Sequence, residues 1–226
     1  FASPHFNLSV SSGDTPADYV DSIKILIFFT MLTLLPSFII MFTSFTRITV
    51  VFSLLKNAIG AQQSIPSQIL GGLAIFLTIF IMQPVYTEIN EVALKPYSNE
   101  EITFEQALEN ASNPIKDFML KETRQKDLEL FVDAAKLNSG ELTRKNIPLY
   151  SIVPAFAISE LKTAFQIGFL LFVPFMVIDM IVASVLMSMG MMMLPPTVIS
   201  LAFKLLLFVM VDGWNLIVKS LITSFS

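Results

Sequence analysis

Long apolar runs alternate with one polar stretch along this chain. Residues 25–46 form a run of 22 without a charged side chain, and 65–87 form a second. A helix of 22 residues is about 33 Å long at ~1.5 Å per residue, enough to cross the hydrocarbon core of a bilayer. Pro36 inside the first run predicts a kink. The two runs, joined by the short connection 47–63, predict a first helical hairpin over 23–87.

The second half of the chain, 149–226, is apolar again. Pro195 and Pro196 disfavour a helix that continues through them, because proline lacks the N–H and crowds the preceding turn. We therefore predict a second hairpin that descends through about 156–189 and returns through about 197–224. Its connection, 187–196, is rich in methionine.

The polar positions gather in two places. Residues 1–22 predict an extended or loosely ordered tail, and its lone His5 has no partner histidine for a metal or catalytic site. The stretch 88–148 predicts a small helical insert outside the bilayer, because it concentrates the acids and shows helix-start signals. These signals are two capping-box spacings, Ser98 with Glu101 and Thr103 with Gln106, and the pair Asn113-Pro114, with Asn138-Ser139-Gly140 as a stop.

Composition supports a membrane as the solvent. The chain is 54% hydrophobic and only 14% charged, with a mean hydropathy of +0.71, whereas a soluble domain carries about 25% charged residues. We predict an all-α integral membrane protein of kinked helical hairpins, with about four apolar segments. The absence of cysteine excludes thiolate metal sites and cysteine nucleophiles, and the net charge of −4 argues against nucleic acid as a partner.

The distribution of basic residues suggests an orientation. The connection 47–63 holds Arg47 and Lys56 and no acid, so the positive-inside rule places it in the cytoplasm. The tail, the insert and the C-terminus would then lie on the outer side. The chain begins with Phe1, so either a signal peptide was removed or the numbering begins at an internal residue.

Six ionisable residues interrupt the apolar half. They are three acids and three bases: Glu160, Lys162, Asp179, Lys204, Asp212 and Lys219. One interpretation is that they lie near the membrane interfaces and extend to water, as we expect for Lys219. The other is that they pair inside the protein, between hairpin arms or between subunits, because an unpaired charge at the bilayer centre costs about 2.5–3.5 kcal/mol. On one continuous helix, Lys204, Asp212 and Lys219 would form a polar stripe.

The methionine run admits two interpretations as well. Six of the 12 methionines lie between Met180 and Met193. Methionine is unbranched and flexible, so Met191, Met192 and Met193 at a hairpin tip could close a pore as a deformable seal. The alternative is an apolar turn buried in lipid or in the protein core.

Several strings resemble one known family, from about residue 20 to the C-terminus. They include Ser159–Phe169, Pro174-Phe175 with Asp179, Gly190–Met193 with Pro195-Pro196, Phe203–Leu205 and Asp212–Trp214. Upstream, Ser44–Ile48 and Phe118–Arg124 are similar too. These strings resemble the FliP family of bacterial flagellar biosynthesis proteins.

The resemblance implies a subunit of the type III secretion export gate in the bacterial inner membrane and the flagellar basal body. Several copies would assemble with FliR and FliQ, contact FlhB and FlhA, and pass unfolded flagellar proteins. It implies no enzymatic activity and no cofactor. It also implies a periplasmic insert, a pore gasket formed by Met191, Met192 and Met193, and charged residues that serve as assembly contacts or intramembrane charges: Glu160, Lys162, Asp179, Lys204, Asp212 and Arg47.

The residues also allow a comparison with two other classes of function. Intramembrane charges and broken helices also suit a secondary transporter or ion channel for small solutes, although 23–87 and 152–224 show no convincing internal repeat. An intramembrane enzyme is disfavoured, because the chain has no H-E-x-x-H, G-x-S-x-G or P-loop motif.

Overall fold

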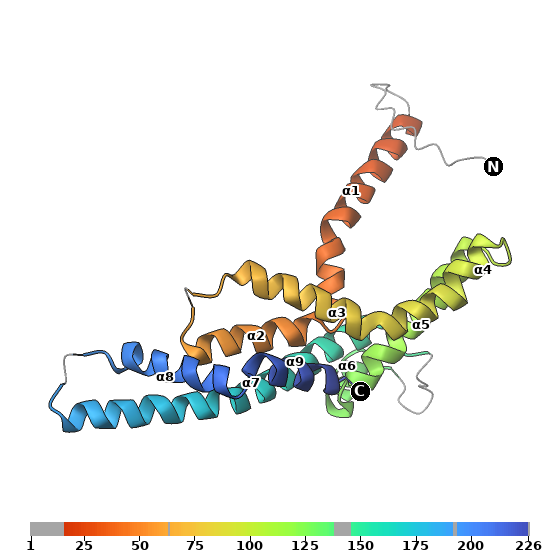
Figure 1. Cartoon of the computed structure of the whole chain (residues 1–226). Coiled ribbons are helices and arrows are strands. Elements are labelled where there is room, and N and C mark those ends of the chain that lie inside the picture. The colour runs from red at the N-terminus through yellow and green to blue at the C-terminus, as the bar shows by residue number, and fades with distance from the viewer. Residues whose placement is uncertain (1–15, 63, 138–145, 192–193, 226) are drawn as a thin grey trace. The chain divides into compact units, whose positions relative to one another are not determined.

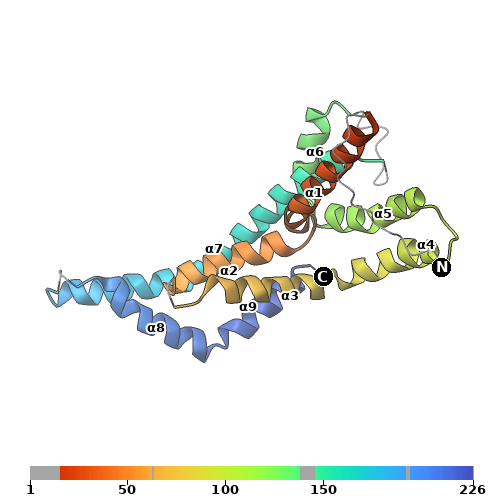
Figure 2. The same ribbon diagram turned by 90° about the horizontal axis from the view of Figure 1, so that it is seen from above.

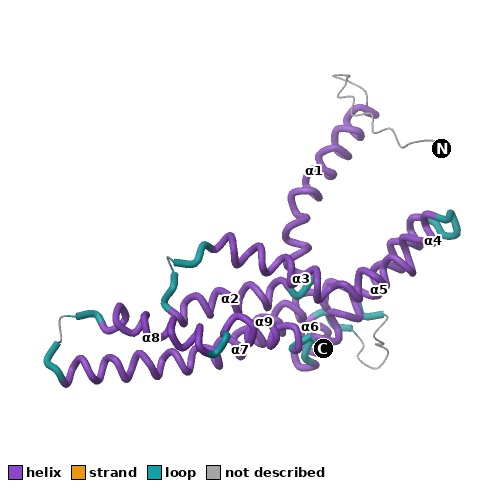
Figure 3. The backbone as a smooth tube through the Cα atoms, in the orientation of Figure 1, coloured by secondary structure: helices purple, strands orange, loops and turns teal. Residues whose placement is uncertain are grey.

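The structure, a computed structural model, describes residues 16–62, 64–137, 146–191 and 194–225. Every regular element in this part of the chain is a helix, which confirms the all-α class (Figures 1 and 3). The chain divides into two compact units, Phe1–Ile39 and Ile40–Ser226, and each is described by itself.

The first unit consists of the helix α1 (Pro16–Phe42), whose last three residues belong to the second unit. The predicted loose tail over 1–22 is wrong for 16–22, which are helical. Proline is favoured at the first helical position, because the N–H that it lacks would have no partner within the helix. Pro36 lies inside α1, and residues 1–15, with His5, lie outside the described residues.

The second unit begins with a helix where the sequence predicted a loop. Helix α2 (Phe45–Ile59) covers most of 47–63. Its apolar side chains Ile48, Val51, Phe52 and Leu55 recur at helical spacing, and each is at most 1% exposed. The segment is therefore part of the core, and Arg47 is buried with it. The positive-inside rule counts basic residues in loops, and most of this segment is helix. The membrane orientation of the chain therefore stays a prediction.

Helix α3 (Ser67–Ile89) runs through a π-helical turn, η1 (Asn90–Leu94), into α4 (Lys95–Ser98). Together they make a continuous helix of 32 residues that passes the predicted insert boundary at residue 88. A π-helical turn disturbs the regular backbone ladder. In η1 the carbonyl oxygen of Val92 accepts a hydrogen bond from Nδ2 of Asn110 at 3.2 Å.

The polar stretch folds into α5 (Phe104–Glu122) and α6 (Gln125–Ala134). The predicted capping box of Thr103 and Gln106 is confirmed, since each side chain accepts the backbone N–H of the other residue. The predicted helix start at Asn113-Pro114 is wrong, because Pro114 lies inside α5. The predicted stop at Asn138-Ser139-Gly140 lies outside the described residues, and α6 ends before it, at Ala134.

The last third forms the predicted second hairpin. Helix α7 (Leu149–Ser188) packs against α8 (Pro196–Met210), and a third helix, α9 (Gly213–Thr223), follows (Figure 1). The sequence did not predict the bend of 64° between α8 and α9. Asp212 at the bend has a left-handed backbone, with φ 51°, and a Cβ on Gly213 would lie 2.3 Å from the ring of Phe208. Any side chain at position 213 would therefore force the Phe208 ring to move.

The core of the second unit lies where α2 runs along α7 (Figure 2). At Gly168 a Cβ would come within 2.2 Å of Leu54 Cδ1, so the missing side chain lets the two helices approach. The adjacent glycines of α3, Gly71 and Gly72, have no atom within 4 Å of their Cβ positions among the described residues. The close helix contact is at a different glycine.

Two helices in the described part of the chain are long and apolar enough to cross a membrane. They are Ser67–Ser98 and Leu149–Ser188, and the bent α8–α9 pair makes a third if it counts as one span. A shorter apolar helix covers Ile25–Phe38. These lengths and compositions support a membrane protein.

Candidate functional site

Arg47 is the centre of a buried charge network. Its Nε donates to Glu160 Oε2 at 3.0 Å, and its Nη2 donates to Glu160 Oε1 at 2.5 Å and to Glu122 Oε2 at 2.7 Å. Its Nη1 donates to the backbone oxygen and to Oγ of Ser224, at 2.8 and 3.0 Å. These contacts use all five N–H donors of the guanidinium. The side chains of Arg47, Glu160 and Glu122 are 2%, 0% and 9% exposed.

The C-terminal residues close over the guanidinium. The ring of Phe225 lies with its centroid 3.7 Å from Arg47 Cζ, in a cation–π contact. The carbonyl oxygen of Phe225 accepts a hydrogen bond from Lys121 Nζ at 3.1 Å, and its ring stacks on Phe118. The network therefore ties together α2, α5, α7 and the segment after α9.

Sequence reasoning named Arg47 and Glu160 without pairing them. The two residues are 113 positions apart, and the sequence pattern predicts a loop around Arg47. Glu122 and Ser224 were missed as members of the network. No spacing rule links them to Arg47, because α5 and the C-terminus reach it only through tertiary packing.

A second buried charge pair joins the arms of the hairpin. Lys204 Nζ on α8 donates to Asp179 Oδ2 on α7 at 2.6 Å, and Ser200 Oγ donates to Asp179 Oδ1 at 2.6 Å. The same ammonium donates to the backbone oxygen of Ala58 at 3.1 Å. That carbonyl is in the last turn of α2, where it has no partner within the helix and where the helix dipole favours a cation. Lys204 thus fixes the hairpin to the end of α2.

The other predicted charges of the apolar half are exposed. Lys162, Asp212 and Lys219 lie on the surface, and none of the three forms an ion pair with a described residue. Pairing between hairpin arms is therefore confirmed for Asp179 with Lys204 alone. The stripe that includes Asp212 and Lys219 is wrong, because the helix breaks between Lys204 and Lys219.

A third polar cluster, which the sequence did not indicate, joins α6 to α7. Asp127 Oδ2 accepts hydrogen bonds from Ser159 Oγ at 2.6 Å and from Arg124 Nη2 at 2.5 Å, while the Arg124 backbone N–H donates to Ser159 Oγ at 3.1 Å. The bond from Ser159, helped by Arg124 and by the charge of Lys162, lowers the pKa of Asp127. Among the described residues, no group of His, Cys, Asp or Glu is placed to hold a metal ion.

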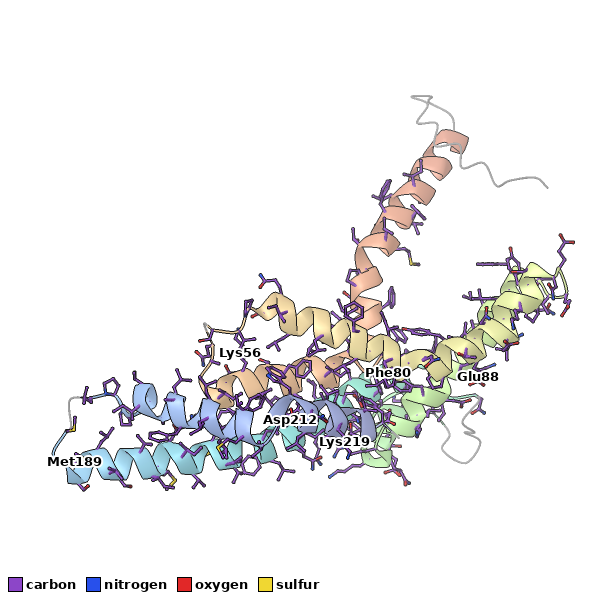
Figure 4. All side chains as sticks on the ribbon, viewed as in Figure 1. Lys56, Phe80, Glu88, Met189, Asp212 and Lys219 are labelled. Carbon is purple, nitrogen blue, oxygen red and sulfur yellow. The ribbon has the colours of Figure 1, made fainter. Side chains whose placement is uncertain are left out.

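The methionine-rich connection lies at the far end of the hairpin from the Arg47 network. Figure 4 shows Met189 at this tip. Met187, Met189 and Met191 are exposed, and Gly190 has a positive φ of 73°. Met192 and Met193 lie outside the described residues. Behind the tip, between α7 and α8, lies an apolar groove of about 410 Å³, whose lining includes Ile181, Val185 and Phe203.

Comparison with known proteins gives the family. A sequence model described as the FliP family matches residues 28–221. The chain belongs to the FliP family. It is 54% identical over 218 residues to the flagellar biosynthetic protein FliP of Bacillus subtilis (strain 168), covering 96% of this chain and 98% of that protein. Against the FliP of Aquifex aeolicus (strain VF5) it is 50% identical over 223 residues, covering 98% and 92%.

More distant members align over the same length. The FliP of Treponema denticola is 43% identical over 224 residues, covering 98% of this chain and 82% of that protein. The family match covers α2 to α8 and almost all of α9. The ion pairs of Arg47 with Glu160 and Glu122, and of Lys204 with Asp179, lie within it, whereas Ser224 and Phe225 lie just beyond it. The chain is a membrane protein of flagellar biosynthesis.

Proposed function

We propose that this chain is a pore-forming subunit of the flagellar type III secretion export gate. Several copies assemble with FliR and FliQ, contact FlhB and FlhA, and pass unfolded flagellar proteins across the bacterial inner membrane. Membership of the FliP family carries this proposal, because the curated relatives are named as flagellar biosynthetic proteins. In the proposed orientation, the termini and the stretch 88–148 face the periplasm.

The geometry of the hairpin supports a gasket at Met191, Met192 and Met193. The connection joins α7 and α8, which the Asp179–Lys204 bond ties to each other, and the hydrogen bond from Lys204 to the Ala58 carbonyl ties this pair to α2. The described methionines of the tip have exposed side chains. Methionine side chains are flexible and repack around an irregular surface. A ring of these connections from several subunits can therefore seal the pore and still open when a polypeptide passes.

The test replaces Met191, Met192 and Met193 together with alanine in cells that carry the flagellar system. We expect assembly to persist and the membrane to become leaky to small ions, because alanine leaves gaps that methionine fills. Met180→Ala is the control, since Met180 is also an exposed methionine but lies within α7, away from the connection. If cells with the triple variant remain impermeable to small ions and export flagellar proteins normally, the gasket assignment is wrong.

The mass of the detergent-purified complex tests the pore itself. A large hetero-oligomer with a central channel is the expected result, and a monomer would contradict the proposal. The alternative of a small-solute transporter predicts uptake by liposomes that contain this chain alone. The export-gate proposal predicts no such uptake.

A further inference from the structure

Lys56 carries a positive charge in an otherwise uncharged stretch of the sequence. It is the only Asp, Glu, Lys, Arg or His between Arg47 and Glu88. It lies half-buried in the last turn of α2, and its Nζ donates to Ser67 Oγ at 3.0 Å. No carboxylate in the described ranges forms an ion pair with it. An ammonium has three N–H donors, so two remain for a ligand.

A pocket of about 210 Å³ opens beside this ammonium, between α2 and α3. That is the space of roughly seven water molecules at ~30 Å³ each, so a tetrahedral phosphate group fits. The pocket combines three hydroxyl side chains with an apolar floor. Its lining is Lys56 with Thr49, Ser53, Ser67, Phe52, Leu70 and Gly71.

The pocket lies at the start of the candidate membrane span Ser67–Ser98, where polar side chains are followed by an exposed apolar face. Exposed Gln62 and Gln68 flank the start of α3. Beyond them, Ile69, Phe76 and Phe80 are 63%, 73% and 59% exposed, as expected of side chains that face lipid tails. Figure 4 shows Lys56 near the connection between α2 and α3, with Phe80 farther along α3. The pocket lies beside the first turn of the candidate span Ser67–Ser98. The ends of a helix that crosses a bilayer lie near the lipid headgroups.

We propose that this pocket binds the phosphate of an anionic phospholipid headgroup. Lys56 donates to the phosphate oxygens, because a charge-assisted bond from an ammonium to a phosphate is strong. The hydroxyls of Ser53 and Ser67 add two donors. The acyl chains follow the exposed apolar face of α3, which is why the ligand is a lipid rather than free phosphate.

The experiment uses the full chain in a neutral detergent and counts bound lipids by native mass spectrometry. The probes are phosphatidylglycerol and phosphatidylcholine with identical acyl chains. We expect tighter binding of phosphatidylglycerol, and Lys56→Gln should weaken that binding about fivefold without changing phosphatidylcholine binding. Lys56→Arg should retain the preference, because it keeps the charge.

Lys219→Gln is the matched control. Lys219 is an exposed lysine on the apolar helix α9 that also borders a pocket, so a general loss of charge would affect both variants. Helix content by circular dichroism shows that each variant is folded. Equal binding of the two lipids, or equal effects of Lys56→Gln and Lys219→Gln, would overturn the proposal. Displacement of phosphatidylglycerol by millimolar inorganic phosphate would overturn the assignment to a lipid.

Discussion

Replacing Arg47 with methionine tests whether the buried charge network holds the helices together. Methionine keeps a long apolar stem and removes every donor to Glu160, Glu122 and Ser224. Glu160 is 0% exposed, so water cannot replace the lost donors. Removing one partner of a buried pair costs about 3–5 kcal/mol, a large part of the roughly 5–15 kcal/mol that stabilises an ordinary domain.

The free energy of unfolding is measured by titrating the protein with sodium dodecyl sulfate in mixed micelles and following helix loss by circular dichroism. Lys95→Met is the control, because it breaks the Lys95–Glu91 pair, in which both side chains are 55% exposed. Such a surface pair contributes about 0.3–0.5 kcal/mol. If Arg47→Met costs no more than Lys95→Met, the network does not stabilise the fold.

A double variant separates the interaction energy of the Arg47–Glu160 pair from the individual contributions of the two side chains. Arg47→Met with Glu160→Met removes the stranded carboxylate together with its partner, and apolar residues often replace a buried pair at little cost. The double variant should therefore be more stable than Arg47→Met alone by about 1 kcal/mol or more. A double variant that loses the sum of the two single effects would refute the coupling between Arg47 and Glu160.

Three further predictions concern local packing, capping and pH. Gly168→Ala should destabilise the protein by about 1–3 kcal/mol, because its Cβ would meet Leu54, whereas Gly71→Ala, in open space, should be neutral or stabilising by up to about 1 kcal/mol; thermal unfolding compares the two. Thr103→Ala should cost about 1 kcal/mol through the lost capping box, and hydrogen exchange in the first turn of α5 should rise. The folded pKa of Asp127 is lowered, so its contribution is present above the unfolded carboxyl pKa of about 3.9 and is lost as pH falls through the folded pKa. Asp127→Asn should therefore lose stability at pH 6 and show a flatter acid profile below pH 4 than the unsubstituted chain, and an unchanged profile would contradict this.

Much of the local structure follows from the sequence alone. Apolar runs, prolines and polar caps act over a few residues. The sequence therefore predicts the second hairpin, the turn before Pro196 and the capping box at Thr103. The membrane class follows from composition, because a bilayer requires apolar surface whatever the packing. The strings around Glu160 and Met191 were enough to indicate the family.

The tertiary structure decided which charges meet. The positive-inside rule predicts a loop around Arg47. In the structure, Arg47 is buried next to the apolar face of Ile48, Val51, Phe52 and Leu55, and it pairs with Glu160, 113 residues away in the sequence. Local patterns hold no information about such a distance, because burial of a charge depends on which partners other helices bring. The balanced count of acids and bases predicted pairing but not the pairs, and Lys56, which no pattern singled out for a ligand, was left beside an open pocket.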